Sequence, residues 1–194
     1  MSAHLPLRNR PSGPAASDIE TRPGGIGRGT SEAAEAVSDD LRRRDDPFLS
    51  SRRRTAGFSL ASMASLGVVA AYQYGLLRHL PEPPLPFFDA DRVDASGEAY
   101  QLFKAPDAAL GIASTAVTLV LAGMGGADRR RTRRWIPVAL AAKAIGDAAF
   151  GVYLTAEQGT KHRKFCFWCL CAAAANVAAV PGTWPEVRTA LARS

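Results

Sequence analysis

The sequence has few cysteines, and its first 55 residues include few large apolar side chains. Both features restrict the class of protein. Only three cysteines occur among 194 residues, all between 166 and 171, which excludes a disulfide-stapled scaffold. Residues 1–55 have few large apolar side chains but contain ten Arg and eight acidic residues, so this segment cannot bury a core. Residues 56–77 contain no charged residue at all. A soluble enzyme with evenly distributed surface charge is therefore disfavoured.

The net charge of +6 could suggest nucleic-acid binding, but the positions of the arginines argue against it. They gather at the ends of apolar runs, in clusters at 42–44, 52–54 and 129–134. This pattern is typical of the flanks of membrane segments, where basic residues set orientation without a binding partner. We therefore expect membrane lipid, and no nucleic acid, among the partners of this chain.

Four apolar stretches approach the roughly 20 residues that a helix needs to cross about 30 Å of hydrocarbon. They cover 56–77, about 108–126, 135 to about 156, and 165 to about 184. The fold class predicted is all-α: a polytopic membrane protein with a four-transmembrane-helix bundle and a disordered N-terminal tail. We expect a disordered cytoplasmic tail over 1–55, a membrane domain over 56–184 and a short cytoplasmic tail over 185–194. A short helix is expected over 96–103.

Basic residues near the helix ends predict the orientation in the membrane. One side collects thirteen: Arg42, Arg43, Arg44, Arg52, Arg53, Arg54, Arg129, Arg130, Arg131, Arg133, Arg134, Arg188 and Arg193. The other side collects six: Arg78, Arg92, Lys104, Lys161, Arg163 and Lys164. Both termini are therefore predicted to be cytoplasmic in a cell (inner) membrane. The loop over about 78–107 and the start of the fourth stretch then lie at the external face.

Cys166 and Cys169 open the fourth apolar stretch, and their spacing predicts a reactive dithiol. Residues three apart on a helix are separated by about 60° around its axis, so both sulfurs face the same way. A helix start favours thiolate, and Lys161, Arg163 and Lys164 add positive charge, so lowered thiol pKa values are expected. Cys171 lies about 200° from Cys169 and is interpreted as packing. The alternative for the pair is that Cys serves only as a small apolar residue.

Three further polar features of the apolar stretches have structural interpretations beside functional ones. Lys143 and Asp147 lie on one helical face, and a mutually satisfied ion pair is favoured over a functional site. Asn176 follows Cys169 by seven residues, so it lies on nearly the same face and is first interpreted as an interhelical hydrogen bond. His79 and His162 fall in the external loops, but no four-ligand spacing appears, and no metal site is predicted.

Together these features resemble the vitamin K epoxide reductase family, quinone-coupled thiol oxidoreductases with a four-helix membrane core. The resemblance covers about residues 56–184. It rests on the order of four membrane helices, on the CxxC pair that opens the fourth, and on Pro-Asp-Ala-Ala-Leu-Gly at 106–111, which is similar to the family's Pro-then-Gly start of the second helix.

The resemblance implies a role for each of these residues. Cys169 would react with the quinone and Cys166 would exchange disulfides, while Asp107 would contribute to the quinone pocket. Asn176 is a further candidate for this pocket, because it lies on nearly the same helical face as Cys169. The co-substrate would be a ubiquinone or menaquinone type of quinone, and the partner a thioredoxin-like or other external dithiol protein. The family normally carries a second Cys pair in the loop after helix one, whereas 78–107 contains no Cys. Direct attack of a partner thiol on the Cys166–Cys169 disulfide could bypass that relay.

The predicted function is therefore that of a membrane thiol oxidoreductase. It would couple dithiol/disulfide exchange with external partner proteins to reduction of a membrane quinone. The alternative is a non-catalytic four-helix membrane protein whose cytoplasmic tail recruits partners.

Overall fold

The computed structural model describes residues 32–192, and the regular elements in this range are helices, as the sequence predicts. Their bounds are α1 Glu32–Arg43, α2 Pro47–Gln73, α3 Ala90–Asp94, η2 Gly97–Tyr100, α4 Asp107–Gly123, α5 Arg129–Thr132, α6 Trp135–Glu157, η3 Gln158–His162, α7 Phe167–Ala179, η4 Val180–Thr183 and α8 Trp184–Leu191. Elements η2 and η4 are 3₁₀ helices, and η3 is a π-helical turn.

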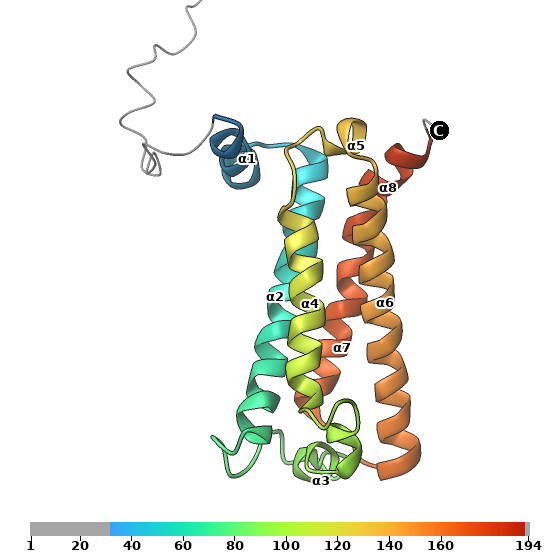
Figure 1. The fold of residues 1–194 in the computed structure, drawn as a ribbon. Helices are drawn as coiled ribbons and strands as arrows, with labels where there is room; N and C mark the ends of the chain where they lie inside the picture. The colour runs from blue at the N-terminus through green and yellow to red at the C-terminus, as the bar shows by residue number, and fades with distance from the viewer. Residues whose placement is uncertain (1–31, 193–194) are drawn as a thin grey trace, which may run out of the picture. The chain divides into compact units, whose positions relative to one another are not determined.

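Helices α2, α4, α6 and α7 lie side by side within the unit Ala36–Ser194, with α2 against both α4 and α7 and α6 against α7 and α4 (Figure 1). A glycine allows the close approach of α2 and α4: a Cβ on Gly111 would lie 2.9 Å from Cδ1 of Leu66. The four apolar stretches therefore form helices that pack against one another.

The burial pattern of the bundle is that of helices surrounded by lipid. Three helical segments are long and apolar enough to cross a membrane, Pro47–Gln73, Trp135–His162 and Phe167–Leu191, and α4 is a shorter apolar helix of 17 residues. Many large apolar side chains of the bundle are exposed, whereas several small polar ones are buried between the helices. The outward set includes Val120, Ile145, Phe150 and Val177, and the buried set includes Ser59, Ser62, Thr115 and Thr118. Small residues at helix contacts and apolar residues outside are typical of membrane bundles.

Helical structure begins earlier than the predicted disordered tail over 1–55 allows. Helix α2 begins at Pro47, because Asp46 accepts hydrogen bonds from the backbone N–H groups of Phe48 and Leu49, at 2.8 and 3.4 Å. Helix α1 precedes it, so residues 32–55 are largely helical. The predicted short tail over 185–194 contains most of α8, and its place in the cytoplasm stays a prediction. Residues 1–31 and 193–194 lie outside the described residues, so disorder in the first of these segments stays a prediction.

A buried cluster of three charges ties α2, α5 and α8 together at one end of the bundle. Glu186 accepts from Nε of Arg52 at 2.9 Å and from Nε of Arg129 at 3.0 Å, and none of the three residues is more than 2 % exposed. Arg52 also donates to the carbonyl of Gly126, and Arg129 to that of Met124, at 2.9 and 2.7 Å. Arg52 and Arg129, which the sequence places among the basic residues flanking the apolar runs, are therefore buried and paired with a carboxylate. Eleven basic residues then remain on that side against six, so the predicted orientation is unchanged.

The Lys143–Asp147 ion pair predicted within the third apolar stretch is present, and it is joined to the neighbouring helix. Asp147 on α6 pairs with Lys143 and also accepts from the hydroxyls of Ser114 and Thr118 on α4, at 2.8 and 2.6 Å. Lys143 donates to Ser114 at 2.9 Å. Every charge in this network has a hydrogen-bond partner, so the expected ion pair is mutually satisfied, and its purely structural role stays a prediction.

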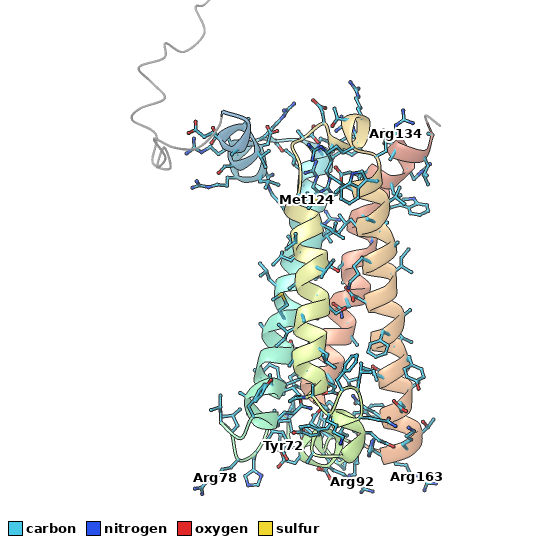
Figure 2. All side chains as sticks on the ribbon, in the orientation of Figure 1. Tyr72, Arg78, Arg92, Met124, Arg134 and Arg163 are labelled. Atoms are coloured by element: carbon cyan, nitrogen blue, oxygen red, sulfur yellow. The ribbon has the colours of Figure 1, made fainter. Side chains whose placement is uncertain are left out.

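The segment between α2 and α4, residues 74–106, folds over the start of α7. Phe88 and Phe165 form an isolated parallel β-bridge, in which Asp89 N donates to Phe165 O at 3.1 Å and Phe165 N to Phe87 O at 3.0 Å. Figure 2 shows Tyr72, Arg78, Arg92 and Arg163 at this end of the bundle, and Met124 and Arg134 at the other. The helix expected over 96–103 is the shorter η2, and left-handed backbone at Phe103 and Lys104 follows it.

Candidate functional site

The two cysteines of the CxxC motif lie at the first turn of α7 with their sulfurs on one side, as the spacing predicts. Cys166 is the N-cap residue, and its Sγ accepts a hydrogen bond from the backbone N–H of Cys169 at 3.2 Å. The backbone N–H of Cys166 donates to Oε1 of Gln158 at 3.0 Å, which fixes the entry into the helix. Both residues are free thiols. Cys166 is fully buried and Cys169 half-buried, so the outer cysteine is the less accessible one.

Asp94, at the end of α3, is the third member of this site, and sequence reasoning missed it. The thiol of Cys169 donates to Oδ1 of Asp94 at 3.4 Å, and a carboxylate oxygen and both sulfurs all lie within 4.8 Å of one another. Asp94 is 2 % exposed, and its Oδ2 has no hydrogen-bond partner among residues 32–192. The sequence offers no signal for this contact, because Asp94 is one of several acidic residues in its loop and α3 must fold over α7 to bring it there.

Burial shifts the pKa values of the groups at this site that lie outside the membrane-spanning segments. Desolvation raises the pKa of Asp94 to about 6, although hydrogen bonds from the thiols of Cys166 and Cys169 oppose the rise. For Cys166, the hydrogen bond from Cys169 favours the thiolate, but burial and the Asp94 carboxylate outweigh it, so the pKa of this thiol is raised. The prediction of a lowered thiol pKa is wrong for Cys166.

Two of the three basic residues expected to favour the thiolate, Lys161 and Lys164, are engaged elsewhere. Lys161 pairs with Glu157 and, at 3.3 Å, with Glu98, while Nζ of Lys164 donates to the carbonyl of Pro86 at 2.6 Å. The two external histidines also face carboxylates: His79 lies 2.6 Å from Asp91, and His162 lies 2.9 Å from Glu98 beside an open depression of about 590 Å³. These contacts therefore hold the external loops together.

Apolar side chains surround the thiols and explain the strong effect of burial. Cys166 belongs to a buried apolar cluster that α2, the 74–106 segment and α4 share, with Trp168 and Ile112 packed against it. The other buried members of the cluster are Val69, Ala70, Leu80, Ala90, Val93 and Ala108. A dithiol with a carboxylate in such a low-dielectric pocket can form and break a disulfide, provided that protons have a local acceptor.

Comparison with known proteins identifies the family to which this architecture belongs. The family model described as "Vitamin K epoxide reductase family" matches residues 54–184. The chain belongs to the vitamin K epoxide reductase family. No curated protein and no solved structure matches it. Family membership and the apolar helices make the chain a multi-pass membrane protein of a class of thiol oxidoreductases linked to quinone.

Asp107, the residue that the family resemblance assigns to the quinone pocket, lies at the first residue of α4 beside the dithiol site. Its Oδ1 accepts from Nε2 of Gln73 at 2.7 Å, and Oε1 of Gln73 accepts from Ala108 N at 3.3 Å. Nε2 of Gln73 also lies 3.4 Å from the carbonyl oxygen of Asp94. Gln73, at the end of α2, therefore joins the two carboxylate-bearing segments and is a second residue that sequence reasoning missed.

The two remaining sequence candidates lie apart from this group of polar atoms. Asn176 is half-buried on α7, seven residues or about 10 Å of helix beyond Cys169. Cys171 is half-buried and does not belong to the cluster of Asp94, Cys166 and Cys169. The chain departs from the vitamin K epoxide reductase pattern in the 74–106 segment. This segment contains no cysteine, and the residue that it brings to the CxxC pair is Asp94.

Proposed function

We propose that this protein oxidises dithiols of partner proteins and passes the electrons to a membrane quinone through Cys166 and Cys169. The observation that carries the proposal is the pair of free thiols at the start of α7, joined by the hydrogen bond from Cys169 N to Cys166 Sγ. The family match adds the class of reaction. The site offers what such a reaction needs, two sulfurs within disulfide reach at the end of a membrane bundle.

Partner oxidation begins with Cys166 and Cys169 joined in a disulfide. A thiolate of the partner attacks Cys166 Sγ, the Cys166–Cys169 bond breaks, and Cys169 leaves with the electron pair. The second partner thiolate then attacks the partner sulfur of the mixed disulfide, which releases an oxidised partner and the reduced CxxC pair. No relay cysteine is needed in this scheme. Because Cys166 is fully buried beneath the 74–106 segment, this segment has to move before a partner can reach it.

A quinone would accept the two electrons and two protons released when the dithiol closes again to a disulfide. The residues placed to hold it are Asp107 and Gln73, a hydrogen-bonded polar pair beside the apolar cluster around Cys166. A polar pair against apolar walls fits a ring with two carbonyl oxygens and an apolar tail. Asn176, deeper along α7, is a second candidate for this pocket. Turnover assays with ubiquinone and with menaquinone distinguish the two types of quinone.

Trapping of mixed disulfides tests the proposal and the separate roles of the two cysteines. Cys169→Ser is expected to accumulate a covalent complex between Cys166 and a thioredoxin-like or other external dithiol protein, whereas Cys166→Ser is expected to trap none. Cys171→Ser is the matched control and retains quinone reduction. If the Cys166→Ser/Cys169→Ser double variant keeps the quinone reduction of the wild type, the proposal is wrong and the scaffold alternative is favoured.

The proposed topology has four membrane crossings, both termini in the cytoplasm and the CxxC pair at the external face. Helix α4, with 17 residues, spans about 25 Å and would be the fourth crossing. The bias of basic residues toward the end that holds α5 and α8 supports this orientation. Protease treatment of spheroplasts that carry an N-terminal tag tests it, and removal of the tag from outside would reverse the assignment.

A further inference from the structure

The buried carboxylate of Asp94 lies against the inner thiol of the CxxC pair, and this contact has a chemical consequence. We infer that Asp94 is the proton acceptor for Cys169 when the dithiol closes, and the proton donor to Cys169 when the disulfide opens. The inference rests on the proposed function, in which Cys166 and Cys169 cycle between dithiol and disulfide. Asp94 touches a reacting atom, since Oδ1 lies 3.4 Å from Cys169 Sγ and accepts its hydrogen bond.

The dithiol needs a local base because the thiolate, and not the thiol, attacks a disulfide. The site lies beneath the 74–106 segment, where water has little access: Cys166 is fully buried and Asp94 is 2 % exposed. Asp94 has a free acceptor, because Oδ2 has no partner within the described part of the chain. A carboxyl with a pKa near 6 is largely ionised at neutral pH and can still take up a proton.

The other titratable groups that face Asp94 are less suited to this transfer. Among the hydrogen bonds of residues 32–192, the only carboxylate oxygen that accepts from a cysteine thiol is that of Asp94. Asp107 is held by Gln73, and Oε1 of Glu82 accepts from Ala90 N. The groups that face Asp94 from the surrounding elements are Tyr72 of α2, Glu82 of the 74–106 segment, Asp107 of α4, and Cys166 and Cys169 at the start of α7.

Closure from a mixed disulfide is the reverse of the partner's attack on the Cys166–Cys169 disulfide, and it needs no quinone. Cys166 first carries a mixed disulfide with a partner sulfur, and the proton of the Cys169 thiol passes to Asp94. The Cys169 thiolate attacks Cys166 Sγ, the bond between Cys166 and the partner sulfur breaks, and the partner sulfur leaves with the electron pair. In the opening direction, the partner thiolate attacks Cys166, and Asp94 returns its proton to the departing Cys169 thiolate.

A quinone-free assay isolates this step. Reduced protein with Cys171→Ser, purified in detergent, is mixed with 2,2′-dipyridyl disulfide, whose released thiopyridone is followed by absorbance. The first release reports formation of the mixed disulfide, and the second reports closure by the remaining thiol. We expect Asp94→Asn to slow the second release at least about tenfold at pH 7, with the first release changed less than about threefold. Asp94→Glu should restore part of the rate.

The matched control is Glu82→Gln, which removes a charge from the same segment at a residue whose carboxylate accepts no hydrogen bond from a thiol. Its second release should stay within about threefold of that of the parent. A measurement on the parent protein adds a test that needs no folded variant: the rate of closure should fall as the pH is lowered through about 6, because Asp94 becomes protonated. Asp94→Asn should lack this inflection and keep only the rise at higher pH that accompanies thiol ionisation.

Three outcomes would overturn the inference: an Asp94→Asn closure rate within twofold of the parent, a parent rate that does not change between pH 7 and 5, or a product with two mixed disulfides and no internal disulfide. Failure of the proposed function has a different signature. In that case the parent protein closes its disulfide with the pH dependence described, but neither ubiquinone nor menaquinone reoxidises the reduced protein.

Discussion

Replacing Glu186 by Gln should destabilise the bundle strongly, because Glu186 is the shared partner of two buried arginines. Gln has nearly the same volume, so the substitution removes the charge without creating a cavity. Arg52 and Arg129 would keep their backbone carbonyl partners, such as those of Gly126 and Met124, but would lose the carboxylate that compensates both positive charges.

The expected magnitude follows from the burial of all three side chains, none of which is more than 2 % exposed. Removing one partner of a buried ion pair costs about 3–5 kcal/mol. Because Gln keeps one acceptor oxygen and both guanidinium groups keep carbonyl partners, we expect the lower end, about 3 kcal/mol. This corresponds to a fall of roughly a hundredfold in the folding equilibrium constant.

Unfolding of the purified protein by SDS in mixed micelles, followed by circular dichroism, measures this change. Asp128→Asn is the control at the same end of the bundle, because Asp128 is largely exposed and lies 3.8 Å from Arg130, so its loss should cost less than about 1 kcal/mol. If Glu186→Gln cost no more than Asp128→Asn, the backbone carbonyls alone would suffice to hold both arginines, and the reasoning would be refuted.

Two further substitutions test the packing of the bundle by the same unfolding measurement. Gly182→Ala should cost about 1–3 kcal/mol, because its Cβ would lie 2.8 Å from the carbonyl oxygen of Ser51 on α2, whereas Gly123→Ala, which has open space, should not destabilise. Asp147→Ala should cost more than Lys143→Met, because it removes an acceptor that three donors share and leaves Lys143 with only Ser114, while the lysine substitution removes only one donor. The reverse order would contradict the hydrogen-bond network between α4 and α6.

The sequence predicted the four apolar helices well where charges bound them on both sides. Helix α6 covers Trp135–Glu157 against an expected 135–156, since arginines precede it and polar residues follow. The start of α2 was placed too late because Arg52 was interpreted as a residue at the water boundary. Its burial depends on Glu186, 134 residues away in sequence. Local patterns cannot reveal such a partner, which the chain acquires only when α8 packs against the bundle.

The candidate site also combines features that local sequence predicts with features that depend on distant residues. The CxxC spacing placed both sulfurs on one face, which is a property of a single helical turn. The thiol pKa was predicted from the helix dipole and neighbouring basic residues, and for Cys166 this failed because the groups that decide its pKa are distant in sequence. Burial beneath the 74–106 segment and the approach of Asp94 both arise from the folding of α3 over α7.

The clip between the 74–106 segment and the start of α7 is entirely non-covalent, and this sets how the protein would respond to its surroundings. It consists of the Phe88–Phe165 bridge together with side-chain hydrogen bonds from Lys164 to Pro86 O and from Trp168 to Pro81 O. Where a loop is fastened by a disulfide, a reducing medium releases it. Here temperature, denaturant and the lipid in contact with the loop instead govern the equilibrium between the covered and the uncovered dithiol. The glutathione redox potential does not act directly on the contacts that hold the loop.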